Sequence, residues 1–207
     1  MLRRTKGRLL ITLLVITGLA GTIHDTALSK KERKLAINLM KDTKTEFFQS
    51  VRGLSKSQLN FKSVKGQFSI KEHIYQASFI ENKLWHLLET TMKAPANPEK
   101  RSEIAITDEN ILNSLTNADG NIECFAVSEK KIISGKAIDD LLAGFKNKRA
   151  EHIKYINTST EDLRNHVLQM PFGWIDCYQL YLVIAVQSHL YTQEINQLKA
   201  DKNFPGK

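Results

Sequence analysis

The chain has 207 residues, which is enough for one domain with a sizeable core. Its composition is that of a globular protein, with 42% hydrophobic and 25% charged residues, and only 4 Pro and 10 Gly argue against turn-rich β structure. The net charge of +8 includes Arg3, Arg4, Lys6 and Arg8. The other basic residues are scattered without an Arg-rich helix, which argues against a nucleic-acid partner.

Residues 1–20 have the pattern of a secretory signal peptide, because a basic start precedes about twelve mostly apolar residues and then small residues. The apolar run is short for a spanning helix, which needs about twenty residues. An uncleaved inner-membrane anchor formed by residues 9–20 is the alternative. We predict export to the periplasm or cell envelope, with residues 21–28 as a disordered spacer before a folded domain over residues 29–207.

Three long helices are predicted to begin with a capping box, in which the cap residue and a Glu or Gln three residues later bond each other's backbone. The pairs are Ser29 with Glu32, Ser69 with Glu72, and Asp176 with Gln179. The three helices end near Gly53, Met92 and Lys199.

A fourth long helix is predicted over residues 136–156, where apolar residues recur at helical spacing. A short helix is predicted over residues 108–116, and a further short helix is considered after Thr160. The last long helix is rich in apolar residues from Tyr178 to Leu198, so we expect it to be buried. Four long amphipathic helices predict an all-α four-helix bundle with short additional helices.

Three separated motifs then resemble the DinB-like superfamily. They are residues 53–62 (GLSKSQLNFK), 68–73 (FSIKEH) and 193–205 (QEINQLKADKNFP), which occur in the expected order. The resemblance implies a bundle of four main helices, often dimeric, with a divalent metal typically held in a cleft by three histidines. It also implies kinship with low-molecular-weight-thiol transferases and with uncharacterised metal-dependent hydrolases.

The positions that the resemblance assigns to the metal carry no histidine here. One family histidine lies eight residues after the aromatic of the second motif, which is Phe68, so its position is Gln76. The other two lie four apart on the last helix, and the third motif aligns them with Gln187 and Tyr191. An amide oxygen is a weak ligand for zinc or nickel, and a neutral phenol is poorer still. We therefore predict a relic pocket, an uncharged polar cluster of these three residues.

A shifted alignment would instead make His189 and Gln193 the ligand pair on the last helix. His189 is two residues from both Gln187 and Tyr191, so it does not share their face. The shifted alignment would lose the register of the third motif, so the relic pocket at Gln76, Gln187 and Tyr191 is preferred over the shifted pair.

Other polar and aromatic residues are weaker candidates. Glu194 replaces the Gln that the family usually has three residues after its last histidine. Trp174 either lines a ligand entrance or belongs to an apolar plug over the end of the bundle. His73 is expected to pack or to point to solvent, off the face of Gln76, and His166 lies in a loop where it could line the mouth of a cleft.

We expect a non-catalytic protein that binds a small molecule or a partner and needs no cofactor. The alternative is a metal-dependent hydrolase or thiol transferase that holds zinc or nickel weakly through the substituted ligands. A homodimer is a third expectation, and no membrane contact is expected beyond an N-terminal anchor. A disulfide between Cys124 and Cys177 is not favoured, because nothing in the sequence brings the two together.

Overall fold

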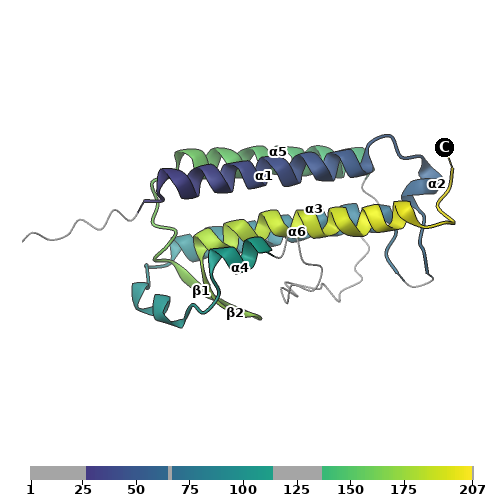
Figure 1. The fold of residues 1–207 in the computed structure, drawn as a ribbon. Coiled ribbons are helices and arrows are strands. Elements are labelled where there is room, and N and C mark those ends of the chain that lie inside the picture. The colour runs from purple at the N-terminus through teal and green to yellow at the C-terminus, as the bar shows by residue number, and fades with distance from the viewer. Residues whose placement is uncertain (1–26, 65–66, 114–136, 207) are drawn as a thin grey trace, which may run out of the picture.

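The computed structural model describes residues 27–64, 67–113 and 137–206. The predicted signal peptide and Cys124 lie outside these residues. Four long helices make up the bundle, as Figure 1 shows: α1 (Lys30–Val51), α3 (Ile70–Lys93), α5 (Ile138–Thr158) and α6 (Cys177–Ala200). The all-α four-helix bundle predicted from the sequence is confirmed.

All three predicted capping boxes form. The Asp176 carboxylate accepts a hydrogen bond of 2.8 Å from the backbone N–H of Gln179, and the boxes at Ser29 and Ser69 have the same reciprocal pattern. A fourth box, of Ser55 and Gln58, starts the short helix α2 (Lys56–Leu59), which the sequence analysis missed. Gly53 follows the end of α1 with φ of +69°, a conformation in which glycine has no steric cost.

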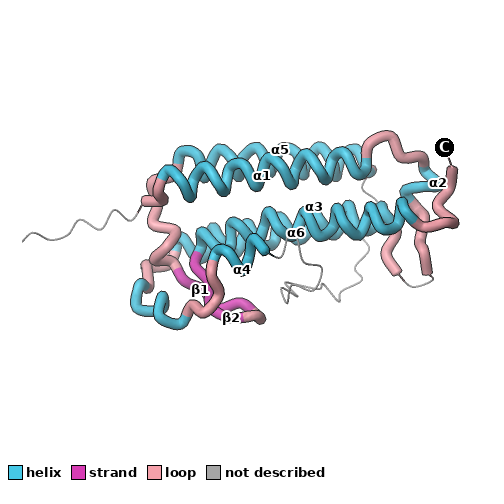
Figure 2. The backbone as a smooth tube through the Cα atoms, in the orientation of Figure 1, coloured by secondary structure: helices cyan, strands magenta, loops and turns pink. Residues whose placement is uncertain are grey.

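The connection before α6 contains a β-hairpin, drawn in magenta in Figure 2. Strand β1 (Val167–Met170) pairs antiparallel with β2 (Gly173–Asp176). No helix follows Thr160, so that part of the prediction is wrong, since the chain there turns and then extends. Pro171 and Phe172 form the two-residue turn between the strands, and Gly173 has φ of +132°, which L residues rarely adopt. A 3₁₀ helix, η1 (Pro98–Glu103), and α4 (Asp108–Asn113) complete the described elements.

The long helices pack around a ring in the order α1, α6, α3, α5. Helices α1 and α6 run parallel, as two hydrogen bonds between them show. The Tyr178 hydroxyl donates to the Glu32 carbonyl near the starts of the helices, and Lys199 donates to the Ser50 carbonyl near their ends. Helix α3 runs the opposite way to α6 (Figure 1). It runs parallel to α5, since Glu81 meets Arg149 and, one turn on, Trp85 stacks on His152.

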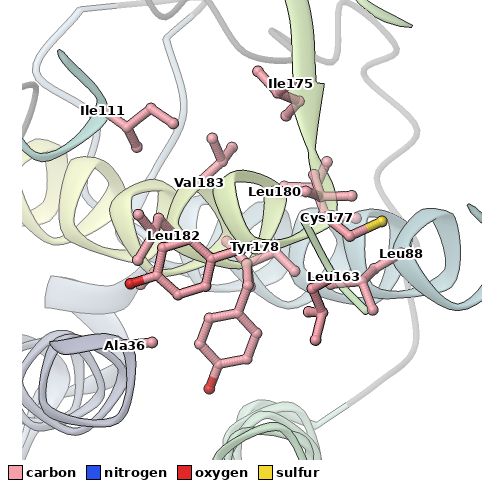
Figure 3. Close-up of a cluster of buried hydrophobic side chains, with 14 of the residues drawn as sticks. Ala36, Leu88, Ile111, Leu163, Ile175, Cys177, Tyr178, Leu180, Leu182 and Val183 are labelled. Carbon is pink, nitrogen blue, oxygen red and sulfur yellow. The ribbon is translucent and has the colours of Figure 1, made fainter. Parts of the chain in front are cut away.

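Helix α6 is the most enclosed element of the bundle. Every residue from Cys177 to Ser188 is buried, because α4 and β2 cover the side of α6 that α1 and α3 leave open. Figure 3 shows side chains of this helix among Ala36 of α1, Leu88 of α3 and Ile111 of α4. The predicted burial of the last helix is confirmed over its first half.

The folded domain begins before the predicted N-cap. Leu28 was assigned to the spacer, but it is buried in the core beside the start of α1. Within the described residues, no helix combines the length and the apolar content that crossing a bilayer requires.

Candidate functional site

The three residues of the predicted relic pocket lie on α3 and α6, which pack against each other. Gln76 and Gln187 are 4% and 6% exposed, and Tyr191 is half-buried. The His73 ring lies 6.3 Å from the Tyr191 ring, which fixes the antiparallel register of the two helices. Gln76, almost one turn further along α3, is therefore level with the segment of α6 between Gln187 and Tyr191. That these side chains join in one polar cluster stays a prediction.

His73 belongs with these residues, contrary to the sequence analysis. It is 6% exposed, it contacts Tyr191, and it lies three residues before Gln76 on the same helix. Residues three apart on a helix are neighbours on its surface, so His73 shares the face of Gln76. The spacing alone was enough to make this assignment.

Two buried polar atoms in this region find no hydrogen-bond partner among the described residues. They are Nδ1 of His73 and Oε1 of Gln76. Buried polar groups normally have a partner in the protein, in ordered water or in a ligand. The region around His73 and Gln76 therefore has hydrogen-bonding capacity that the described residues do not use.

The donor set does not fit a transition metal. Burial raises the pKa of Tyr191 to about 12, so its phenol stays protonated at neutral pH. Amide oxygens and neutral phenols are poor ligands for zinc or nickel. No group of three or more His, Cys, Asp or Glu side chains in the described ranges is arranged to hold an ion.

A pocket of about 360 Å³ adjoins His73 at the end of the bundle where α3 begins and α6 ends. Its lining residues are Ser63, Gln67, Phe68, His73, Glu194, Gln197 and Leu198. Glu194, one of the alternative site residues from the sequence, is thus a pocket residue. The pocket lies one helical turn from the relic position Tyr191.

Lowering the pH through the range below about 6.5 is expected to destabilise the fold through His73. Burial lowers the pKa of His73 to about 4, against a partial opposing effect of the neighbouring Glu72 carboxylate. Between the unfolded pKa of 6.5 and this value, the unfolded chain takes up a proton that the folded chain refuses. The free energy of unfolding should therefore be undiminished above pH 6.5 and fall by about 2 to 3 kcal/mol by about pH 4.

Urea denaturation of the native chain and of His73→Gln, at neutral pH and near pH 4.5, measures this effect. The variant should lose most of the pH dependence in this window. The exposed His86 on the same helix gives the control His86→Gln, which should keep it. Equal pH dependence in the native chain and His73→Gln would show that His73 titrates as an exposed residue does.

His189 and Gln193 face a different part of the bundle. His189 Nδ1 lies 2.8 Å from Oε2 of Glu46 on α1, and its Nε2 lies 2.9 Å from the Gln193 amide. Both residues line a polar groove of about 330 Å³ between α1 and α6. This position agrees with the expectation that His189 does not share the face of Gln187 and Tyr191.

A larger cleft, of about 970 Å³, lies at the hairpin end of the bundle. At its centre, the Arg164 guanidinium pairs with the carboxylates of Glu32, Asp108 and Asp176 at 2.6 to 2.9 Å and lies 4.1 Å from the Tyr178 ring. Burial opposes the charge of Arg164, but the three carboxylates raise its pKa. These ion pairs join α1, α4 and the start of α6.

Trp174 and His166 belong to this hairpin end. Trp174 lies on β2 with Lys100 Nζ 5.2 Å from its ring centre. Tyr191 is fourteen residues beyond the start of α6, which is about 21 Å along the helix. His166 has Nδ1 2.7 Å from the Asp162 carbonyl and Nε2 3.1 Å from the Ala94 carbonyl, so it joins the hairpin connection to the end of α3. Neither residue lines the pocket beside His73.

A buried charged cluster inside the bundle was missed by the sequence analysis. Arg149 of α5 is fully buried, and its Nε lies 2.7 Å from the Glu81 carboxylate of α3. His152 is also fully buried, with its ring stacked 3.8 Å from Trp85 and its Nδ1 3.0 Å from Glu81 Oε1. Arg149 and His152 fall on the apolar stripe of the predicted helix over residues 136–156. Polar side chains on such a stripe indicate a buried polar cluster, because they need a partner inside the protein.

Comparisons with known proteins are consistent with this fold. Neither models of known protein families nor curated protein sequences give a match. A solved structure, YfiT from Bacillus subtilis, is similar with a TM-score of 0.59 and 14% sequence identity. The similarity covers 84% of this chain and 89% of YfiT, which is described as a probable metal-dependent hydrolase with an unusual four-helix bundle topology. This chain therefore has the four-helix-bundle fold of YfiT, which is the fold that its DinB-like motifs predict.

Proposed function

We propose that this chain is an exported, non-catalytic DinB-like bundle that binds a small molecule in place of the ancestral metal ion. The observation that carries the proposal is the side-chain chemistry at the three relic positions. Gln76, Gln187 and Tyr191 keep the positions polar and buried on α3 and α6 but supply only amides and a neutral phenol. Export is proposed on the pattern of residues 1–20 alone.

The adjoining pocket supports the binding of a small molecule. The pocket offers hydrogen-bonding groups and apolar surface around a buried imidazole, which is the composition of a recognition site. The competing function, a metal-dependent hydrolase or thiol transferase, needs an ion held by the substituted residues.

Metal analysis distinguishes these two functions. The purified chain is freed of metal with a chelator, incubated with zinc, nickel or manganese, desalted and analysed for bound metal. We expect far less than one ion per chain, because amide and phenol oxygens do not compete with water for these ions as imidazole does.

Matched variants identify the origin of any metal that is found. Gln187→Ala removes a relic residue, and Gln193→Ala removes the same side chain from another face of α6. Binding near one ion per chain that falls only in Gln187→Ala would support the enzyme and overturn the proposal. Residual metal that is equal in all three proteins would agree with it.

A further inference from the structure

The charge of the pocket beside His73 points to one class of ligand. Among the described residues that line it, Glu194 carries the only formal charge at neutral pH, because His73 stays neutral when its pKa is about 4. The nearby Glu72 carboxylate is 2.7 Å from Lys62, so that pair adds little net charge. The lining is therefore anionic.

The pocket offers hydrogen-bond acceptors from several residues, and the Gln67 and Gln197 amides that line it have both an acceptor oxygen and donor N–H groups. The Ser63 hydroxyl donates a hydrogen bond to the Asp201 carboxylate, so only the lone pairs of its oxygen remain for a ligand. That hydrogen bond and the neighbouring Lys202 lower the pKa of Asp201, so the charges of Asp201 and Lys202 offset each other. His73 is 94% buried, and its Nδ1 is enclosed by protein, so the residue lines the pocket without presenting that nitrogen to a ligand.

One side of the pocket is apolar. Phe68 and Leu198 line it, and the Phe68 ring lies 5.7 Å from the His73 ring with the planes at 78°. The pocket is thus lined by both the Phe68 ring and the Glu194 carboxylate. This combination favours cations, because an aromatic ring quadrupole and a negative charge both attract them. Its volume of about 360 Å³ is in the range for small-molecule sites.

We propose that this pocket binds a small organic molecule in which a protonated amine is attached to an apolar body. The ammonium group donates to the Glu194 carboxylate beside His73, and the apolar part packs on Phe68 and Leu198. This inference rests on the proposed binding function and adds the class of ligand to it. Anionic ligands are disfavoured because the Glu194 carboxylate would repel them.

Three probes of nearly equal size test the proposal: 2-phenylethylamine, 2-phenylethanol and phenylacetate. Their affinities for the chain are measured by calorimetry at neutral pH, and the imidazole signals of the six histidines are followed by NMR in the same titrations. The amine should bind at least about tenfold more tightly than the alcohol, and the carboxylate should not bind. The amine should shift the His73 signal more than the signal of the exposed His86.

Two charge-matched variants locate the interaction. Glu194 is exposed, so Glu194→Gln should fold normally, and it should weaken amine binding about tenfold while leaving the alcohol unchanged. Glu151→Gln removes an exposed carboxylate from α5 and should leave all affinities unchanged. Equal affinity for amine and alcohol, or an amine affinity that Glu194→Gln does not alter, would overturn the inference.

The outcome separates this inference from the proposed function. Tight binding of the alcohol or the carboxylate at His73, with no preference for the amine, would contradict the inferred ligand class. The proposed function, binding of a small molecule, would still hold. Stoichiometric metal held through Gln187 would overturn the proposed function, whatever the amine does. A specific amine site in a chain without tightly bound metal would support both.

Discussion

Replacing Arg149 by alanine is expected to lower the free energy of unfolding by about 3 to 5 kcal/mol. The guanidinium reaches from α5 to the three other long helices. It pairs with Glu81 of α3, contacts Met40 and Thr43 of α1, and donates to the Ile184 carbonyl and the Ser188 hydroxyl of α6. Its removal leaves the Glu81 carboxylate, which is 3% exposed, without its cation and creates a cavity where all four helices meet.

Urea denaturation monitored by circular dichroism gives the change in free energy. The double variant Arg149→Met with Glu81→Leu should recover most of the loss, because a buried ion pair can be replaced by apolar side chains at little cost. Lys148→Ala is the control on the same helix and should change stability by less than about 0.5 kcal/mol, since its ion pair with Glu151 is exposed. A loss below about 1 kcal/mol in Arg149→Ala would mean that water reaches Glu81.

Histidine at the three proposed relic positions is expected to create a zinc site. The variant Gln76→His, Gln187→His and Tyr191→His places two imidazoles four apart on α6 and a third across from them on α3. Three imidazoles that leave one position open form the ligand arrangement of many zinc centres. We expect one zinc ion per chain, with affinity on the order of a thousandfold above the native chain, because zinc sites of this kind reach apparent binding energies of about 10 kcal/mol or more.

The site should also respond to acid and to ligand concentration. Zinc should dissociate as the pH falls below about 6.5, where imidazole takes up a proton. Excess zinc should raise the melting temperature of the variant but not of the native chain.

The control for the zinc site uses the shifted pair of residues. His189 is native, so Gln76→His with Gln193→His also provides two histidines four apart on α6 and one on α3. Because His189 and Gln193 face α1, this variant should bind zinc no better than a two-histidine surface site. Equal zinc binding by the two variants would mean that the alignment of the relic positions is wrong.

The long helices could be predicted because their signals are local. The capping boxes at Ser29, Ser69 and Asp176 depend on residues three apart, and all three are present in the structure. The hairpin could not be predicted in the same way. Its two strands have four residues each, and what stabilises β1 is its pairing with β2 and the bonds from Asn97, which lies seventy residues away along the chain.

The candidate site was predictable only in part, for a related reason. The relic positions were assigned through the resemblance to the DinB-like superfamily and stay a prediction, whereas the helical period alone would have added His73. The meeting of Glu81 with Arg149, by contrast, depends on the axial register of α3 against α5. Register between helices is set by packing over their whole length, and no single spacing in the sequence reports it.

The ring order of the helices determines when native packing can form during synthesis. Helices α1 and α3 are consecutive long helices, but each has its most extensive packing with α6, which is synthesised after the three other long helices. The nascent chain therefore cannot complete this core before α6 has been made, although α5 can already pack on α1 and α3. Under the proposed export, this dependence on α6 is compatible with passage through a translocation channel, because a channel admits chains that have not yet folded.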